Sequence, residues 1–186
     1  MELKNCDVCG QPEVNEAARV VCTFCGKTFD TQSYCAHGHH VCNDCANLET
    51  PAILEKVISN TRSTSPGEIL EMVIAHPKLT MHGAAHHYIV PVILIAAVRN
   101  TGYPMPVEAV QQALQRGMQV PGGFCGFCGD CGAGVGLGIA VSALTMATPL
   151  NGKKRSLAME ATSTALARMC DDMPRCCKKA GRIACE

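Results

Sequence analysis

The spacing of apolar residues changes near Thr50, and this change divides the chain into two parts. After it, apolar residues recur every three to four positions, which is the period of helices that bury one face. Before it, a short stretch at residues 19–22 has the character of a strand. The pattern predicts a small N-terminal module, residues 1–48, and a mainly α-helical domain, residues 49–186.

Helix-start and helix-stop residues mark the segments of the helical domain. Pro51 stands in the first turn of a short amphipathic segment. A capping box at residues 65–68 begins a second helix, which Pro77 ends. Further amphipathic segments cover residues 106–116 and 156–169, and strand signals are weak throughout. We therefore expect a helical bundle of five to seven helices.

Two runs of the helical domain are almost entirely apolar, residues 88–98 and 135–150. Both are shorter than the roughly 20 residues that a bilayer-spanning helix needs, so we expect core helices and no membrane span. The second run continues a glycine series at residues 132, 134, 136 and 138. No strand precedes these glycines, and their spacing differs from that of nucleotide-binding loops. They are better explained as a face for close helix packing.

Composition narrows the range of functions. The 16 basic residues balance 16 acidic ones, and aromatic residues make up only 4% of the chain. This balance gives no electrostatic reason to expect a nucleic-acid partner. The first six residues lack the apolar segment of a signal peptide, so we expect a reducing, cytoplasmic location. In that setting 14 cysteines indicate metal or redox chemistry rather than disulfides.

Three Cys-x2-Cys pairs lie within the N-terminal module. The two thiolates of such a pair can occupy adjacent corners of one zinc tetrahedron. A further cysteine and one of three nearby histidines bring the number of donors to eight, enough for two ions. The predicted zinc ligands are Cys6, Cys9, Cys22, Cys25, Cys35, His39, Cys42 and Cys45.

The pairing of these donors has two solutions. Residues 35–45 contain four of them within eleven positions, which is cramped for a single tetrahedron. We therefore favour a cross-braced arrangement, with Cys6, Cys9, Cys35 and His39 on one ion and Cys22, Cys25, Cys42 and Cys45 on the other. A sequential arrangement, in which the first two pairs form a zinc ribbon, stays open. Either one closes the coordination shell, which favours a structural role over a catalytic one.

The helical domain carries a second group of cysteines. Two residues separate each of Cys125, Cys128 and Cys131 from the next. All three lie on a glycine-rich loop that can approach an ion or cluster closely. Cys176 and Cys177 follow near the C-terminus, and a remote cysteine after such a loop resembles the ligand order of bacterial ferredoxins. An iron–sulfur cluster is therefore expected here, with a third zinc site as the rival interpretation.

A histidine pair precedes the first apolar run. His82 and His86 are four positions apart and project from one helix face, the spacing that helical metal ligands use. An imidazole at the edge of a core is costly without a partner, which favours a role as ligand or general base. The alternative is a pair of solvated residues at a helix start. His87 lies to one side of this face.

The chain resembles a cysteine-rich prokaryotic family, domain of unknown function 5714, in motifs that span nearly its full length. The matching motifs are Cys-Thr-Phe-Cys-Gly-Lys at 22–27, Cys-Ala-His-Gly-His-His-Val-Cys-Asn-Asp-Cys at 35–45, Met-His-Gly with His-His at 81–87, Gly-Gly-Phe-Cys-Gly with Cys-Gly-Ala at 122–133, and Pro-Arg-Cys-Cys-Lys at 174–178. The resemblance implies that His39, rather than His37 or His40, binds zinc. It also implies one site made of His82, His86, Cys125, Cys131, Cys176 and Cys177, while Cys128 is not a constant part of the pattern. It implies no activity.

A weaker likeness concerns the segment Cys131-Gly-Ala-Gly-Val-Gly, which is similar to the cluster cysteine and small-residue helix of iron–sulfur serine dehydratases and cysteine desulfidases. We therefore expect either a metal-dependent enzyme that acts on a small molecule by lyase or sulfur-transfer chemistry, or a non-catalytic zinc-binding adaptor or regulator. The enzyme hypothesis requires the helical-domain thiols to converge beside a histidine. We also expect at least three of their sulfurs around a common centre. The sequence leaves oligomerisation open.

Overall fold

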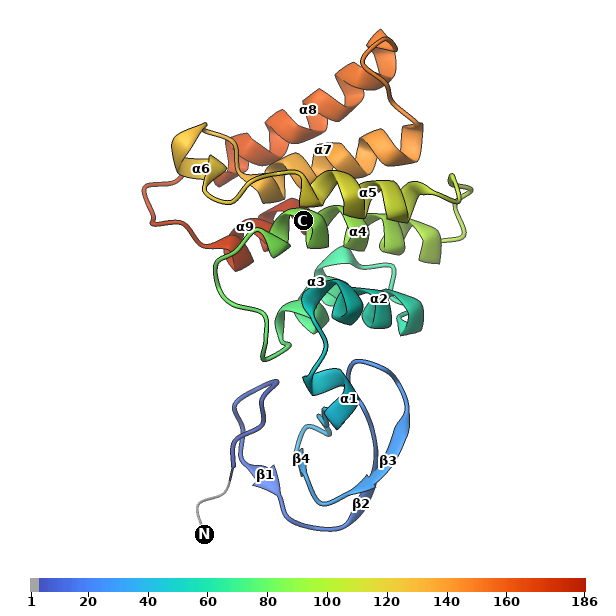
Figure 1. Cartoon of the computed structure of the whole chain (residues 1–186), viewed down its shortest axis with the longest axis vertical. Helices are drawn as coiled ribbons and strands as arrows, with labels where there is room; N and C mark the ends of the chain where they lie inside the picture. The colour runs from blue at the N-terminus through green and yellow to red at the C-terminus, as the bar shows by residue number, and fades with distance from the viewer. Residues whose placement is uncertain (1–3) are drawn as a thin grey trace. The chain divides into compact units, whose positions relative to one another are not determined.

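The computed structural model describes residues 4–186, and its backbone divides into two compact units. The first unit consists of Met1–Thr61 and Glu71–Thr80, and the second of Arg62–Leu70 and Met81–Glu186. Helices dominate the described residues, and strands are few and short, which confirms the mainly α fold expected from the sequence (Figure 1).

Two small two-stranded antiparallel sheets open the first unit. Strand β1 (Glu13–Val14) pairs with β4 (Tyr34–Cys35), and β2 (Ala18–Val21) pairs with β3 (Thr28–Thr31). The strand expected at residues 19–22 is β2, shortened by one residue because Cys22 starts the tight turn that leads into β3. The pairing between β1 and β4 closes a long loop and brings Cys35 back toward the start of the chain.

Helices complete the first unit. Helix α1 (Asn43–Ala46) is a single turn, and α2 (Thr50–Asn60) begins with the expected proline in its first turn. Helix α3 (Pro66–Ile74) begins in the second unit and ends in the first. The apolar face of α2 is buried, with Ile53, Leu54 and Val57 at most 1% exposed.

The second unit is a helical bundle. Its helices are α4 (Ala85–Asn100), α5 (Ala109–Met118), α6 (Phe124–Phe127), α7 (Gly132–Thr145), α8 (Gly152–Met169) and α9 (Cys177–Cys185). Helix α7 packs against α4, α5 and α8, and in Figure 1 it runs between α5 and α8. The short helix α9 packs against α4, α7 and α8 near their ends.

Helix α7 owes its central position to its glycines, as the sequence predicted. A Cβ atom at Gly136 would lie 2.9 Å from Cδ of Pro91 on α4. On the opposite side, a Cβ atom at Gly138 would lie 2.7 Å from the carbonyl oxygen of Ala158 on α8. Because side chains would not fit at these positions, the glycines let α4 and α8 approach the α7 backbone from two sides.

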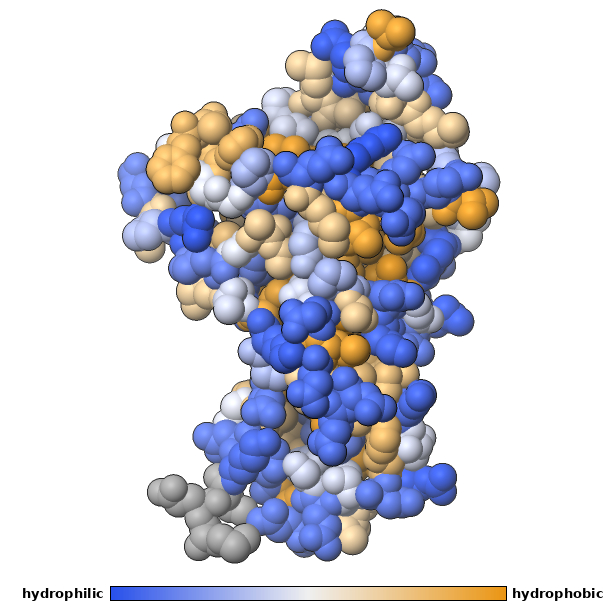
Figure 2. Space-filling model, in the orientation of Figure 1, coloured by the Kyte–Doolittle hydropathy of each residue, from blue (hydrophilic) through white to orange (hydrophobic). Residues whose placement is uncertain are grey.

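Helices α4 and α7, which contain the two apolar runs, are core helices, as expected from the length of those runs. In the described part of the chain, no helix combines the length and the apolar character needed to span a bilayer. Hydrophilic residues cover much of the visible surface, with smaller hydrophobic areas between them (Figure 2).

Candidate metal centres

Four side chains of the first unit form a compact group of donor atoms: Cys6, Cys9, Cys35 and His39. Their ligand atoms all lie within 4.8 Å of one another. The Sγ atoms of Cys9 and Cys35 are 3.7 Å apart, and Sγ of Cys35 is 3.5 Å from Nδ1 of His39. Zinc–sulfur bonds of about 2.3 Å in a tetrahedron give a sulfur–sulfur distance of roughly 3.8 Å, so this group has the size of a zinc site.

A second group in the same unit contains Cys22, Cys25, Cys42 and Cys45, whose ligand atoms also lie within 4.8 Å of one another. The Sγ atoms of Cys25 and Cys42 are 3.9 Å apart. The turn after β2 positions the first pair, because Gly26 has a positive φ of 69° and donates its N–H to the carbonyl of Cys22. Helix α1 positions the second pair, with Cys42 at its N-cap.

The chain alternates between the two groups, and this is the cross-braced arrangement favoured by the sequence. The sequential arrangement, with the first two Cys-x2-Cys pairs around one ion, does not occur among the described residues. Of the three neighbouring histidines, His39 belongs to a donor group, whereas His40 donates through Nδ1 to the carbonyl of Ser33 at 2.7 Å. Each group could hold one metal ion, and both are closed by four protein ligands.

The thiols of the second group influence one another strongly. Burial alone would raise the pKa of Cys22, but backbone N–H groups of Cys42, Cys25 and Phe24 stabilise its thiolate and lower the pKa to about 7. Burial raises the pKa of Cys45, and its neighbours Cys42 and Cys22 raise it further. Four thiolates in one buried group repel each other electrostatically. A divalent cation at their centre would compensate this negative charge and stabilise the deprotonated form.

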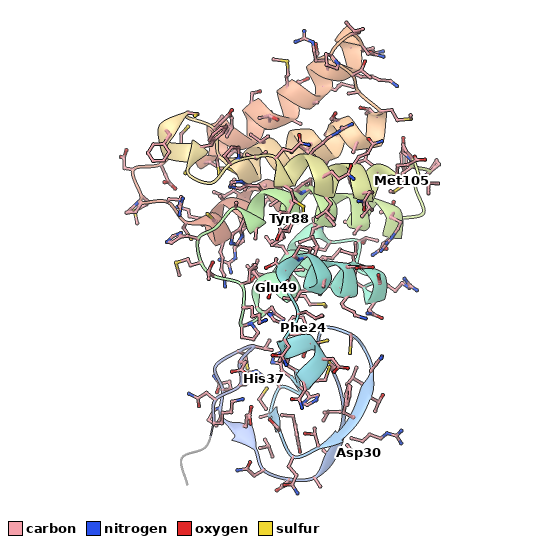
Figure 3. The ribbon with its side chains drawn as sticks, in the orientation of Figure 1. Phe24, Asp30, His37, Glu49, Tyr88 and Met105 are labelled. Carbon is pink, nitrogen blue, oxygen red and sulfur yellow. The ribbon has the colours of Figure 1, made fainter. Side chains whose placement is uncertain are left out.

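A buried histidine that sequence reasoning missed supports this group. Nε2 of His76 donates to the carbonyl oxygen of Cys45 at 3.0 Å, and its Nδ1 accepts from the backbone N–H of Lys78 at 3.2 Å. The ring of Phe24, labelled in Figure 3, packs edge-on against it with centroids 4.6 Å apart. Burial is the main reason that the pKa of His76 is lowered, so the ring is neutral with one defined tautomer. Its partner lies 31 positions away, which no local pattern reveals.

The second unit contains a cavity of about 410 Å³ into which several predicted site residues point. Its lining includes Cys125, Cys131, Cys176, Cys177, His86 and His87. All six stand at or near helix starts: the two histidines in the first turn of α4, Cys125 on α6, Cys131 at the N-cap of α7, and the cysteine pair at the start of α9. Three parts of the chain that are far apart in sequence thus meet at one cavity.

Two predicted residues lie outside this lining. Cys128 is exposed after α6, where Gly129 with a positive φ of 72° reverses the chain direction. His82 is exposed in the segment before α4. Among the described residues, the only donor groups with all atoms within 4.8 Å are those of the first unit. The expectation that three cavity sulfurs already surround a common centre is therefore wrong for this structure, because the thiols stand on separate helix starts around the cavity wall.

The C-terminal wall of the cavity is held by local polar contacts. The Lys179 ammonium pairs with the Asp171 carboxylate at 2.5 Å, which lowers the pKa of Asp171. The backbone N–H of Lys179 donates to Sγ of Cys176 at 3.4 Å, so this thiol caps α9. Arg175 also lines the cavity and brings a second positive charge to this wall.

The protein is thus mainly helical and rich in cysteine. Its first unit contains two groups of side chains that could each bind a metal ion, and its second unit contains a cavity lined by thiols. The chain belongs to a family described as a family of unknown function (DUF5714), whose model matches residues 54–186. No curated protein and no solved structure matches the chain. The match includes every cavity residue but begins after Cys45, so the resemblance over nearly the full length is shown only for the helical part. The likeness to iron–sulfur serine dehydratases and cysteine desulfidases finds no support in these comparisons.

Proposed function

We propose that the protein binds two structural zinc ions in its first unit and a further metal, as an iron–sulfur cluster or another soft ion, in the cavity of its second unit. At the cavity it acts on a small molecule by lyase or sulfur-transfer chemistry. The observation that carries this proposal is that four thiols and two imidazoles from four helix starts line one cavity. Thiols and imidazoles together are donors for soft and borderline metals.

The zinc assignment rests on donor type and spacing. Three thiols with one imidazole, and four thiols, are the donor sets of structural zinc sites, and neither leaves an open coordination position. These ions would stabilise the fold of the first unit. Chemistry on a substrate requires an open position, so it is assigned to the cavity.

The cavity has room for a metal and a small ligand, because ligand sites usually begin at about 300 Å³ and this one measures about 410 Å³. Thiols among Cys125, Cys131, Cys176 and Cys177 would hold the metal with one coordination position left open, where it would supply a Lewis acid when bound. His86 would accept or donate the proton that moves during a lyase or sulfur-transfer step. Arg175 would attract a negatively charged group of the substrate.

Metal analysis of the full-length protein tests the proposal. The protein is purified without oxygen, and zinc, iron and acid-labile sulfide are measured per chain. Cys131→Ser should lose the cavity metal and keep two zinc ions. Cys170→Ser is the matched control, because Cys170 is exposed at the end of α8 and lies outside the cavity. Equal metal content in both variants and in the wild type would contradict a metal site in the cavity.

A second function, a zinc-binding adaptor or regulator without catalysis, is favoured by one observation. The donor groups that are already close enough to share an ion are both closed. For this function, the wild-type protein should contain two zinc ions, no iron and no sulfide. The same metal analysis therefore separates the two functions.

A further inference from the structure

The hydrogen bonding of His87 fixes the tautomer of its neutral ring. Its Nδ1 lies 2.9 Å from the carbonyl oxygen of Val120. A carbonyl oxygen only accepts, so Nδ1 carries the hydrogen. The neutral ring therefore keeps its lone pair on Nε2, the atom that can bind a metal.

The packing of the ring directs Nε2 toward the start of α7. A Cβ atom at Gly132 would lie 2.3 Å from Cγ and Cδ2 of His87, and 2.5 Å from Nε2. The edge of the imidazole that contains Nε2 thus lies directly against the first residue of α7. That residue follows Cys131, the N-cap thiol in the cavity wall. With His87 only 7% exposed, the ring is held between the end of α5 and the start of α7.

We propose that Nε2 of His87 is the nitrogen ligand of the cavity metal, beside the thiols of Cys131, Cys176 and Cys177. This inference rests on the proposed metal site and names a donor that neither the histidine spacing nor the family resemblance selects. A metal-binding histidine commonly donates its other ring N–H to a backbone carbonyl, which orients the ring and raises its basicity. The contact between His87 and Val120 is of this kind. Two thiolates and one imidazole are a donor set of catalytic zinc sites with an open position, so two of these three thiols would complete the set.

The other two histidines are less suited to this role. His82 is exposed and lies outside the cavity lining. His86 lines the cavity, but its side chain is 1% exposed and its Nδ1 is sealed from solvent. His87, which the sequence placed to one side of the predicted pair, lines the cavity and has its ring oriented by a backbone contact.

A site-resolved protection experiment tests the assignment. The reduced full-length protein is equilibrated at buffered free Zn²⁺ concentrations and treated with iodoacetamide, and alkylation of each cysteine is measured by peptide mass spectrometry. In His87→Asn, the amide nitrogen can still donate to Val120, but the atom equivalent to Nε2 is lost. Protection of Cys131, Cys176 and Cys177 should then require at least about 10-fold more free Zn²⁺. Mutation of a residue that only hydrogen-bonds to a metal ligand already lowers metal affinity by about 10-fold or more.

His82→Asn is the matched control, because it makes the same substitution five positions earlier outside the cavity. Its cavity thiols should be protected at the wild-type Zn²⁺ concentration. In all variants, Cys22 and Cys42 should show unchanged protection, since they belong to the first unit. If His87→Asn behaves like the wild type, His87 is not a ligand and the proposed metal site stands. If the wild-type cavity thiols are never protected, both the metal site and this inference fail.

A measurement on the wild-type chain covers the case in which His87→Asn does not fold. In protein labelled with ¹⁵N-histidine, Zn²⁺ should shift the Nε2 resonance of one ring that is protonated at Nδ1, in addition to the response of His39. The absence of this second response in a protein whose cavity thiols are protected would overturn the assignment.

Discussion

Two residues at helix starts, Gly132 and Cys176, shape the wall of the cavity. At Gly132 the missing side chain leaves the space that the His87 ring occupies. At the neighbouring helix start, the Cys176 thiol accepts the N–H of Lys179. Gly132 thus leaves room for a potential metal donor, His87, at the start of α7, and Cys176 is itself a potential donor at the start of α9. The partial positive charge of the backbone at a helix start favours an anionic ligand.

The contact at Gly132 yields a prediction for stability. Gly132→Ala places a methyl group within 2.3 Å of the His87 ring, so either the ring or the start of α7 must move. Overpacking of this kind should lower the free energy of unfolding by about 1–3 kcal/mol. Gly126→Ala is the control, because Gly126 also lines the cavity and a Cβ atom there meets nothing within 4 Å. Denaturant titration of both variants checks the prediction, and equal midpoints would show that the site relaxes without cost.

Sequence reasoning found the cysteines more easily than the histidines. The Cys-x2-Cys spacing is local, so all eight donors of the first unit could be named, including their cross-braced grouping. The contacts of His76 and His87 could not be predicted, because each ring bonds to a carbonyl at a distant position, 31 and 33 residues away. Helical spacing alone selected His82 and His86, and it could not show that Nδ1 of His87 lies beside a carbonyl oxygen.

At the scale of the elements, helix boundaries follow capping residues more closely than apolar spacing. The helix expected at residues 156–169 is α8, which starts four residues earlier because Asn151 accepts the N–H of Lys154 at 3.2 Å. The helix expected at 106–116 is α5, shifted to Ala109–Met118, with a turn after Pro106. The polar first turn of α8 carries no apolar period, so spacing could not reveal it.

The cap of α8 yields the second prediction. Asn151→Ala removes the acceptor for the first turn and should lower the free energy of unfolding of the helical unit by about 0.5–2 kcal/mol. Asn151→Asp keeps an acceptor and adds a negative charge at the helix start, so it should leave stability unchanged or raise it by about 0.3–1 kcal/mol. Thermal unfolding followed by circular dichroism measures both. Equal losses in the two variants would mean that the side-chain cap does not stabilise α8.

For the whole molecule, the two compact units have different sources of stability. The second unit contains the long helices, among them the largely buried α4, and most of the residues matched by the family model. The loops and hairpins of the first unit lie around two groups of donor atoms, with much of the local backbone in turns rather than in sheets. Spacing predicted this contrast, but the sequence could not show that residues 71–80 join the first unit, since that depends on contacts such as the one between His76 and Cys45.

The third prediction follows from this difference in stability. Cys42→Ser removes one donor from the group around Cys22, and the remaining thiols cannot close the coordination shell. Metal binding in structural zinc sites contributes roughly 10–16 kcal/mol, far more than a core of this size can replace. The variant should therefore expose residues 4–48 to proteases while the helices of the second unit stay folded. Cys170→Ser, with an exposed thiol outside both donor groups, should keep wild-type resistance.

Limited proteolysis with mass spectrometry measures this outcome, and circular dichroism at 222 nm reports the helices that remain. Removal of metal from the wild-type chain by a chelator should reproduce the Cys42→Ser pattern, and acidification should do so too, because protons compete with the metal for the thiolates. Re-addition of Zn²⁺ should restore protection in the wild type and only weakly in Cys42→Ser. If residues 4–48 resist proteases equally with and without metal, the first unit is stabilised by its packing, and the two donor groups have another role.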